Sequence, residues 1–271
     1  MAKDLIIFST QRSGTHVLAS LLASHPQISG IGEIFHSTGG RFNFKKYIEG
    51  IHGPGQIRAF SRDLSRFRRV IRAILKFARI RAYPLNLSRF RGEFEGYLQS
   101  ARDEVGGGSL CLILMYNQAA KLHRSVVSEL FLNRGIIHLV RQNVLRTYVS
   151  NYINQNRLKP AHSHAGTETA VLTKIRLPTE ALVTELTRRS AEIQRQREFV
   201  SRFDHVEVCY EDFDGDSFPV RNAAARFGFA DFEASTRQRK SNPQTLKEIL
   251  ENFEDVQKTL KGTEFFAMTL T

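Results

Sequence analysis

The sequence predicts an α/β protein with one mostly parallel β-sheet and helices on both of its faces. Short apolar runs without polar alternation are typical of buried parallel strands. Segments with helical periodicity separate these runs, and strands that alternate with helices form βαβ units. The first run, Leu5 to Phe8, leads directly into a loop of small, polar and cationic residues and then into a helix.

Each strand is expected where β-branched and aliphatic residues cluster, namely at 5–9, 109–115, 135–140 and 206–210. Helices are expected where apolar residues recur three and four positions apart, as do Leu145, Tyr148, Val149 and Tyr152. These helices span 15–24, 88–103, 121–133, 143–157, 179–203, 218–227 and the tail 243–260. Apart from a strand-like run at 28–31, residues 25–55 are predicted to be irregular, and 158–178 to be a polar loop. No repeat or linker divides the chain, so one domain spanning 1–271 is expected.

The loop after the first strand has the composition of a phosphate-binding site. Backbone N–H groups at 13–15 are expected at a helix N-terminus, where they lack intrahelical partners and the helix dipole adds positive charge. Arg12 supplies a full charge, Gly14 permits close backbone approach, and Ser13 and Thr15 add hydroxyl donors. The loop lacks the second glycine and the lysine of nucleoside-triphosphate loops. It is therefore P-loop-like but suits one terminal phosphate; the alternative is a strand-to-helix turn with an incidental arginine.

A second polar cluster follows the strand at 135–140. Arg141 ends that strand, and Ser150 lies about two turns along the next helix. Ligands of open parallel sheets bind outside the carboxyl ends of the strands, so both residues can converge on the first loop. A guanidinium and a hydroxyl suit a second phosphate. In the alternative interpretation Arg141 pairs with a carboxylate and Ser150 only packs.

The chain of 271 residues has a net charge of +12 and a pI near 10, which favours anionic partners. From Arg58 to Arg91 there are eleven Lys or Arg residues and one acid. Apolar residues at helical spacing within 57–80 predict a basic amphipathic helix, part of a helical insertion at about 57–103. Such a helix can lie on an anionic membrane or bind a polyanionic acceptor. The alternative is a helix docked on the domain with its arginines in water.

Cysteine content and hydropathy bear on the compartment. The two cysteines lie in apolar runs, which fits buried thiols in a reducing environment. No apolar run is long enough to span a membrane, so a cytoplasmic protein is expected, with peripheral contact at the inner membrane surface left open. His162 and His164 have no acidic or cysteine partners nearby, and no metal site is predicted.

The ordered set of motifs resembles the sulfotransferases that use 3′-phosphoadenosine-5′-phosphosulfate, in particular the bacterial carbohydrate branch with its nodulation-factor and trehalose sulfotransferases. The motifs are Gln11–Thr15, His25-Pro26, Gly32-Glu33, Arg141 with Asn143 and Ser150, Tyr210–Phe213, Lys240–Pro243 and Leu260–Thr263. They extend over nearly the whole chain. One departure is Ile113, where the family often has a lysine before a Tyr-Asn-Gln run.

The resemblance implies a role for each cluster. The first loop, with Gln11, Arg12, Ser13, Gly14, Thr15 and His16, would bind the 5′-phosphosulfate end of the donor. Arg141 and Ser150 would bind its 3′-phosphate, near which the resemblance also places Arg239 and Lys240; the alternative for these last two is a solvated charged loop. Glu33 stands where this branch has a proposed general base. The product would be adenosine 3′,5′-bisphosphate, and the acceptor a carbohydrate or glycolipid.

Transfer of a sulfuryl group to an alcohol needs a base for the acceptor proton and positive charge at the leaving phosphate. We expect Glu33 to be the base and Arg12 to supply the charge. His36 is the main rival base, because imidazole is a common base at neutral pH, and His16 and His25 flank the same loops. His25 also fits a helix-capping role.

Two other classes of function remain open at this stage. A small-molecule phosphotransferase would share the architecture but needs Mg²⁺ and the missing lysine. A polyanion-binding protein would fit the charge, but no nucleic-acid motif is present, so no specific nucleic-acid partner is expected. The sequence leaves a homodimer open.

Overall fold

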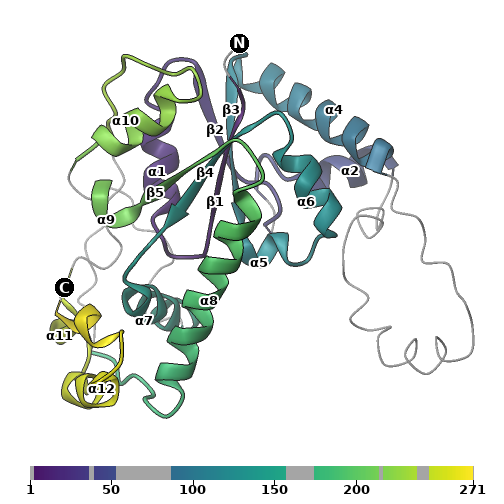
Figure 1. Cartoon of the computed structure of the whole chain (residues 1–271). Helices are drawn as coiled ribbons and strands as arrows, with labels where there is room; N and C mark the ends of the chain where they lie inside the picture. Colours follow the sequence, from purple (N-terminus) through teal and green to yellow (C-terminus); the bar gives the residue numbers. More distant parts are fainter. Residues whose placement is uncertain are drawn as a thin grey trace, which may run out of the picture.

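The computed structural model describes residues 3–36, 40–52, 87–156, 174–213, 216–236 and 244–270. Within them, five strands form one sheet in the order β2-β3-β1-β4-β5, and all neighbouring strands are parallel. The strands are β1 (Leu5–Ser9), β2 (Ile28–Glu33), β3 (Ser109–Met115), β4 (Gly135–Val140) and β5 (His205–Cys209). The predicted parallel sheet flanked by helices is therefore confirmed (Figure 1).

Alternate residues of β1 point into two separate hydrophobic clusters. Leu5 and Ile7 pack in one cluster with side chains of α1 (Thr15–Leu22) and α10 (Phe218–Ala225). Ile6 and Phe8 pack in the other cluster, with side chains of α4 (Leu87–Val105), α6 (Arg124–Phe131), α7 (Val144–Gln155) and α8 (Leu182–Val200). Because both faces are covered, β1, β3 and β4 have nearly continuous apolar runs rather than an alternating pattern.

The region predicted to be irregular, 25–55, contains two regular elements. Strand β2 extends to Glu33, two residues beyond the strand-like run in the sequence, and helix α2 spans Phe44–His52. Glycines at 30 and 32 weaken the strand pattern of β2 in the sequence. In α2, Phe44 and Ile48 are fully buried, and this short apolar face was overlooked among lysines and a glycine.

Two predicted helices differ from the structure. The helix predicted at 121–133 is the shorter α6 (Arg124–Phe131), and a separate turn of helix that was not predicted, α5 (Tyr116–Ala119), directly follows β3. The tail divides into α11 (Leu246–Ile249) and α12 (Phe253–Leu260), and the chain ends in a 3₁₀ turn at Phe266–Thr269. Asn252 separates the two tail helices because its side chain bonds both the N–H and the carbonyl of Leu177.

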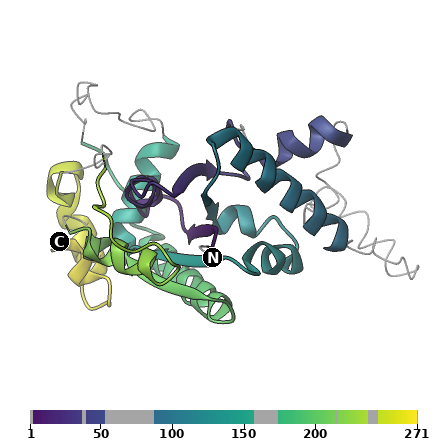
Figure 2. The ribbon, with the colours of Figure 1, turned by 90° about the horizontal axis from the view of Figure 1, so that it is seen from above.

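Figure 2 shows α2 and α4 at one end of the molecule and the C-terminal segment at the other. Helix α4, which the sequence placed at 88–103 in the basic insertion, packs against α6 and β3 and buries Phe90 and Phe94. The amphipathic segment 57–80 lies outside the described residues. Among those that are described, no helix is both long and apolar enough to cross a membrane.

Phe44 is the centre of an aromatic cluster that joins α2 to α4. Its ring lies within 5.8 Å, between centroids, of Phe90, Phe94 and Tyr97. Phe44→Ala is therefore expected to lower the free energy of unfolding by about 3–5 kcal/mol, measured by urea denaturation. Phe218→Ala is the matched control, because that ring is 60% exposed and its loss is expected to change stability by less than about 0.5 kcal/mol. Similar losses in the two variants would contradict this packing.

Candidate active site

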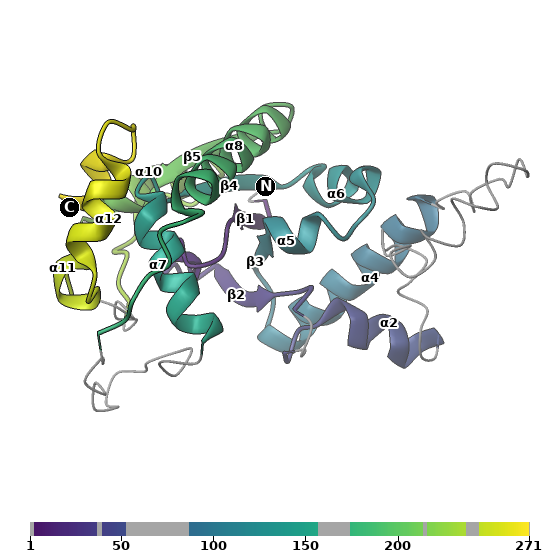
Figure 3. The same cartoon turned by 90° about the horizontal axis from the view of Figure 1, so that it is seen from below.

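The carboxyl ends of the parallel strands form one edge of the sheet, which Figure 3 views from below. The chain leaves β1 toward β2 and leaves β3 toward β4, in opposite directions across the sheet. The ends of β1 and β3, where the direction reverses, are the usual ligand position in this class of sheet. The predicted loop 11–14, Glu33 and Arg141 all lie at this edge.

The loop between β1 and α1 has two residues in the left-handed backbone region. Arg12 has φ 66°, an uncommon value for a residue with a side chain, and Gly14, the N-cap of α1, has φ 88°. A Cβ atom at position 14 would overlap the ring of Tyr210. Only glycine fits there, because both its backbone angle and the close approach of the ring exclude a side chain. Tyr210, the first residue of α9 (Tyr210–Phe213), thus shapes the loop from the opposite side.

Three arginines from three elements converge at this loop. The Nε of Arg12 donates to Oγ of Ser150 at 2.9 Å, and Nη1 of Arg141 donates to the carbonyl of Arg12 at 3.2 Å. The guanidinium of Arg141 lies 4.5 Å from the ring centroid of Tyr210. Arg146, one turn into α7, donates to the carbonyl of Gln244 at 2.6 Å. Arg12 and Arg141, which are 129 positions apart in sequence, therefore belong to one cationic cluster, and the charge of Arg141 also acts on Arg146.

The electrostatics of this cluster favour an anionic ligand. Burial and the charge of Arg141 lower the pKa of Arg12, and the same two causes lower that of Arg146. In the described part of the chain no carboxylate forms an ion pair with Arg141. Two buried donors nearby, Oγ of Ser13 and Nε of Arg141, have no hydrogen-bond partner among the described residues. A bound anion would satisfy both donors and offset the mutual repulsion of the arginines.

A carboxylate holds the backbone that follows Arg141. Both oxygens of Glu211 accept hydrogen bonds, one from the N–H of Gln142 and one from the N–H of Asn143, each at 3.0 Å. Asn143 in turn caps α7, because its Oδ1 accepts from the N–H of Arg146 at 2.8 Å. Tyr210 and Glu211 are adjacent, so one short segment supports both the ring under Arg141 and the turn beside it.

Glu33 is the last residue of β2 and points toward the N-terminus of α1. The register of β2 against β3 shifts between Gly30 and Gly32, and such a bulge changes the direction of the next side chain. Glu33 Oε1 lies 3.6 Å from Nε2 of His16, and Oε2 accepts from Nε2 of Gln118 at 2.6 Å. Burial raises the pKa of the Glu33 carboxyl, but the hydrogen bond and charge of His16, the charge of His36 and the bond from Gln118 outweigh it. The net result is a lowered pKa, so the carboxylate is ionised at neutral pH.

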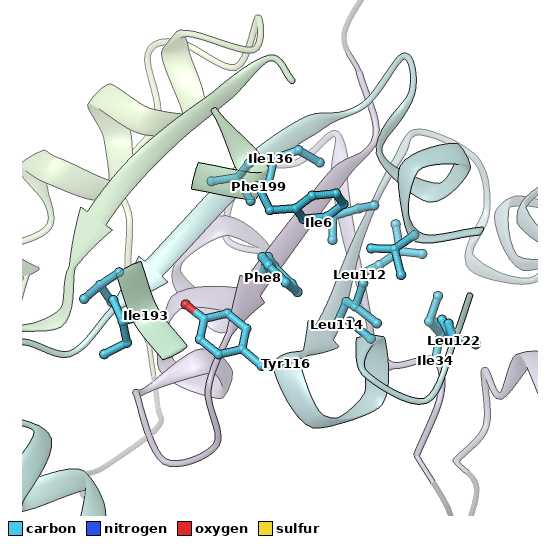
Figure 4. Close-up of a cluster of buried hydrophobic side chains, with 14 of the residues drawn as sticks. Ile6, Phe8, Ile34, Leu112, Leu114, Tyr116, Leu122, Ile136, Ile193 and Phe199 are labelled. Atoms are coloured by element: carbon cyan, nitrogen blue, oxygen red, sulfur yellow. The ribbon is translucent and has the colours of Figure 1, made fainter. Parts of the chain in front are cut away.

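A series of hydrogen-bonded polar side chains lies behind this edge of the sheet. The Tyr116 hydroxyl bonds Nε2 of His138 at 2.5 Å, and Nδ1 of His138 lies 3.0 Å from Oε2 of Glu207. Arg197 of α8 donates twice to Glu207, at 2.8 Å each. Figure 4 shows Tyr116 beside Phe8, among hydrophobic side chains. Tyr116 is buried in the core, and the partly buried Phe35 packs against the same core.

The Glu207 carboxyl makes the stability of the folded protein depend on pH in the acid range. Burial raises its pKa, but the hydrogen bonds and charges of His138 and Arg197 lower it to about 2. Because the folded-state pKa lies below the ordinary value of 4.5, its stabilisation is complete above that value and is lost as pH falls toward 2. In Glu207→Gln, the free energy of unfolding, measured by chemical denaturation, is expected to fall less steeply as pH is lowered over this range. Glu198→Gln, on the exposed side of α8, is the control, and the same slope in both variants would contradict the assignment.

The remaining predicted residues are distributed around this edge. Thr15 is buried in the first turn of α1, and Gln11 is exposed on the loop. His36 is exposed close behind Glu33, with its N–H donating to the Glu33 carbonyl at 3.3 Å. His25 belongs to the core, where its ring packs against Phe229 and Phe232 and its Nδ1 accepts from Gln27. Arg239, Lys240, His162 and His164 lie outside the described residues.

Sequence reasoning missed Arg146 and gave no role in the site to three other supporting residues: Tyr210 and Glu211, which it noted only as part of a motif, and Gln118. The Tyr-Glu pair at 210–211 directly follows a strand, as Arg141 does. This position at the carboxyl end of a strand was the sequence feature that could have identified the pair as part of the site. Gln118 comes three residues after the end of β3, the spacing of a capping box. Throughout the described ranges, no group of three or more His, Cys, Asp or Glu side chains is arranged to hold a metal ion.

No protein-family model matches the sequence, and a search of curated proteins finds no match. Among solved structures, the sulfotransferase domain from the Synechococcus PCC 7002 olefin synthase is similar, with 16% identity and a TM-score of 0.44 over 98% of this chain and 85% of that chain. A sulfotransferase from Alicyclobacillus acidocaldarius has 14% identity and a TM-score of 0.45 over 98% of this chain and 92% of that chain. At such low identity and TM-score the likenesses carry no argument about activity. The α/β class rests on the sheet topology itself, and the functional argument rests on the residues at its edge.

Proposed function

We propose that the protein is a sulfotransferase that moves a sulfuryl group from 3′-phosphoadenosine-5′-phosphosulfate to a hydroxyl group of a carbohydrate or glycolipid. One observation carries the proposal: Arg12, Arg141 and Arg146 converge beside the N-terminus of α1, where Ser13 and Arg141 keep buried donors that find no hydrogen-bond partner in the described part of the chain. The motif resemblance supports the choice of donor.

The arrangement of the cluster fits a nucleotide with two anionic groups. A single ribose carries the 3′-phosphate and the 5′-phosphosulfate, so their binding sites must be adjacent. Arg12 and Ser150 were assigned to different ends of the donor, yet they are hydrogen-bonded to each other, and Arg141 bonds the backbone of Arg12. Ser13 and the N-terminus of α1 would hold the 5′ end, while Arg141 and Ser150 would hold the 3′-phosphate.

The acceptor side is assigned to Glu33. Glu33 lies at the end of β2, which is separated from β1 by β3, and its carboxylate contacts His16 in the first turn of α1. In transfer, the Glu33 carboxylate takes the proton of the acceptor hydroxyl as that oxygen bonds to sulfur and the bond from sulfur to the phosphate oxygen breaks. Arg12 stabilises the negative charge that develops on the departing phosphate. In this proposal the base acts on the acceptor hydroxyl and the cation acts on the leaving phosphate.

A turnover assay tests this function. The protein is incubated with donor labelled at sulfur, EDTA and a panel of oligosaccharides and glycolipids, and both acceptor labelling and nucleotide release are followed by chromatography. Acceptor-dependent labelling in EDTA, with release of adenosine 3′,5′-bisphosphate, is expected. Transfer of phosphate from Mg²⁺-ATP to the same acceptors, without sulfuryl transfer, would overturn the proposal in favour of a phosphotransferase.

A further inference from the structure

Gln118 connects the first turn of α5 to the Glu33 carboxylate. Its side chain is 7% exposed and makes two hydrogen bonds. Oε1 accepts from the backbone N–H of Met115 at 3.1 Å, and Nε2 donates to Oε2 of Glu33 at 2.6 Å. The two bonds join the end of β3 to the end of β2.

These two bonds fix the orientation of the amide. The N–H of Met115 can only donate, so the atom that faces it must be the amide oxygen. The NH₂ group must then face Glu33, and it can only donate. A protonated carboxyl oxygen at that position would direct its own hydrogen against the amide hydrogens. Protonation is thereby confined to Oε1, and because an ionised carboxylate accepts a stronger hydrogen bond than a neutral carboxyl group, Gln118 favours the ionised form of Glu33.

Resting on the function proposed above, we propose that Gln118 is a positioning residue for Glu33. It keeps the carboxylate ionised and fixes Oε2, so that Oε1, on the side of His16 and α1, is the oxygen that meets the acceptor hydroxyl. His16 and His36 are the titratable groups that also face this carboxylate, and Nε2 of His16 lies 3.6 Å from Oε1.

The surroundings of α5 make this support rigid. Tyr116 of the same helical turn is bonded to His138, which leads to Glu207 and Arg197. Its ring packs 4.8 Å from that of Phe8 at the centre of the sheet. A side chain held by a packed and hydrogen-bonded neighbour places a reacting group more accurately than a loop residue does.

Gln118→Glu separates positioning from a merely structural role. Glutamate keeps the oxygen that accepts from Met115, so the cap of α5 is retained. It replaces the donor to Glu33 with a second carboxylate oxygen, and the two carboxyl groups must then share a proton. The apparent pKa of the pair is expected to rise by about one unit or more relative to Glu33 in the natural chain. Gln118→Met, which adds no charge, is expected to raise the pKa of Glu33 by less.

The test follows carboxyl titration by ¹³C NMR in protein labelled at the glutamate side chains, with the Glu33 signal assigned by its loss in Glu33→Gln. Gln257→Glu, the same substitution on α12, is the control and is expected to leave the Glu33 titration unchanged. An unchanged Glu33 titration in both Gln118 variants would overturn the proposal. A thermal denaturation scan of each variant confirms that the titrated protein is folded.

Kinetics provide the second readout. In Gln118→Glu the acid limb of the plot of kcat against pH is expected to move to higher pH, together with the NMR titration. The affinity for adenosine 3′,5′-bisphosphate is expected to stay within about twofold of that of the natural chain. A change in nucleotide affinity with an unmoved acid limb would contradict positioning of the base. NMR titration needs no substrate, so absence of sulfuryl transfer in the natural chain would refute the proposed function without obscuring the Gln118–Glu33 coupling.

Discussion

Replacing Glu33 with glutamine is expected to lower turnover about 10²–10⁴-fold while leaving donor affinity nearly unchanged. The amide has the shape of the carboxylate and can still accept the bond from Gln118, so the end of β2 keeps its structure. It cannot take the proton of an acceptor hydroxyl. The loss is therefore expected in kcat, measured by release of adenosine 3′,5′-bisphosphate at saturating acceptor.

Two further variants make the Glu33 result decisive. Glu104→Gln removes a carboxylate that pairs with Arg41 on the surface, and its turnover is expected to match that of the natural chain. His36→Gln tests the rival base and is expected to change turnover by less than about tenfold, because His36 is exposed and contributes charge near Glu33. A larger loss in His36→Gln than in Glu33→Gln would transfer the role of base to the histidine.

Arg141→Ala is expected to weaken binding of adenosine 3′,5′-bisphosphate about 10–100-fold, as calorimetry would show. The variant loses a charged donor to the 3′-phosphate, whereas adenosine 5′-monophosphate, which has no such group, should bind with little change. Arg141→Lys should fall between the two, because an ammonium keeps the charge but not the planar fork. Selective loss of the bisphosphate is the signature of a 3′-phosphate site.

Arg141 also supports the loop, since it bonds the carbonyl of Arg12 and lies over Tyr210. Equal weakening for both nucleotides would show that this structural role dominates, and the assignment to the 3′-phosphate would be wrong. Arg226→Ala is the matched control, because it removes an equal charge from an exposed ion pair with Asp204. Its nucleotide affinities are expected to equal those of the natural chain at the same ionic strength.

The strands that build the sheet centre could be predicted because their burial on both faces leaves an unbroken apolar signature. Leu5–Phe8 and Gly135–Val140 show it clearly, and the observed β1 and β4 contain them. Strand β2 is an outer strand of the sheet and contains glycines at a bulge. Its apolar pattern is therefore weaker, and only Ile28–Ile31 was recognised. The bulge that obscures the strand in the sequence is also the feature that redirects Glu33.

The sequence identified many residues of the candidate site but could not predict which of them contact one another. Glu33 and Gln118 are 85 positions apart, and nothing local in either segment indicates that β2 and β3 are neighbours. The bond from Arg12 to Ser150 spans 138 positions and depends on α7 packing beside the first loop. Arg146 was not selected because a lone arginine in a helix is ordinarily a solvated charge.

The central claim is that the arginine cluster binds a nucleotide with phosphates at both the 3′ and the 5′ positions, without a metal. Isothermal titration of the natural chain in EDTA with adenosine 3′,5′-bisphosphate and, separately, adenosine 5′-monophosphate tests it most directly. We expect the bisphosphate to bind at least about tenfold more tightly. Equal affinities, or no binding of either nucleotide, would contradict the account.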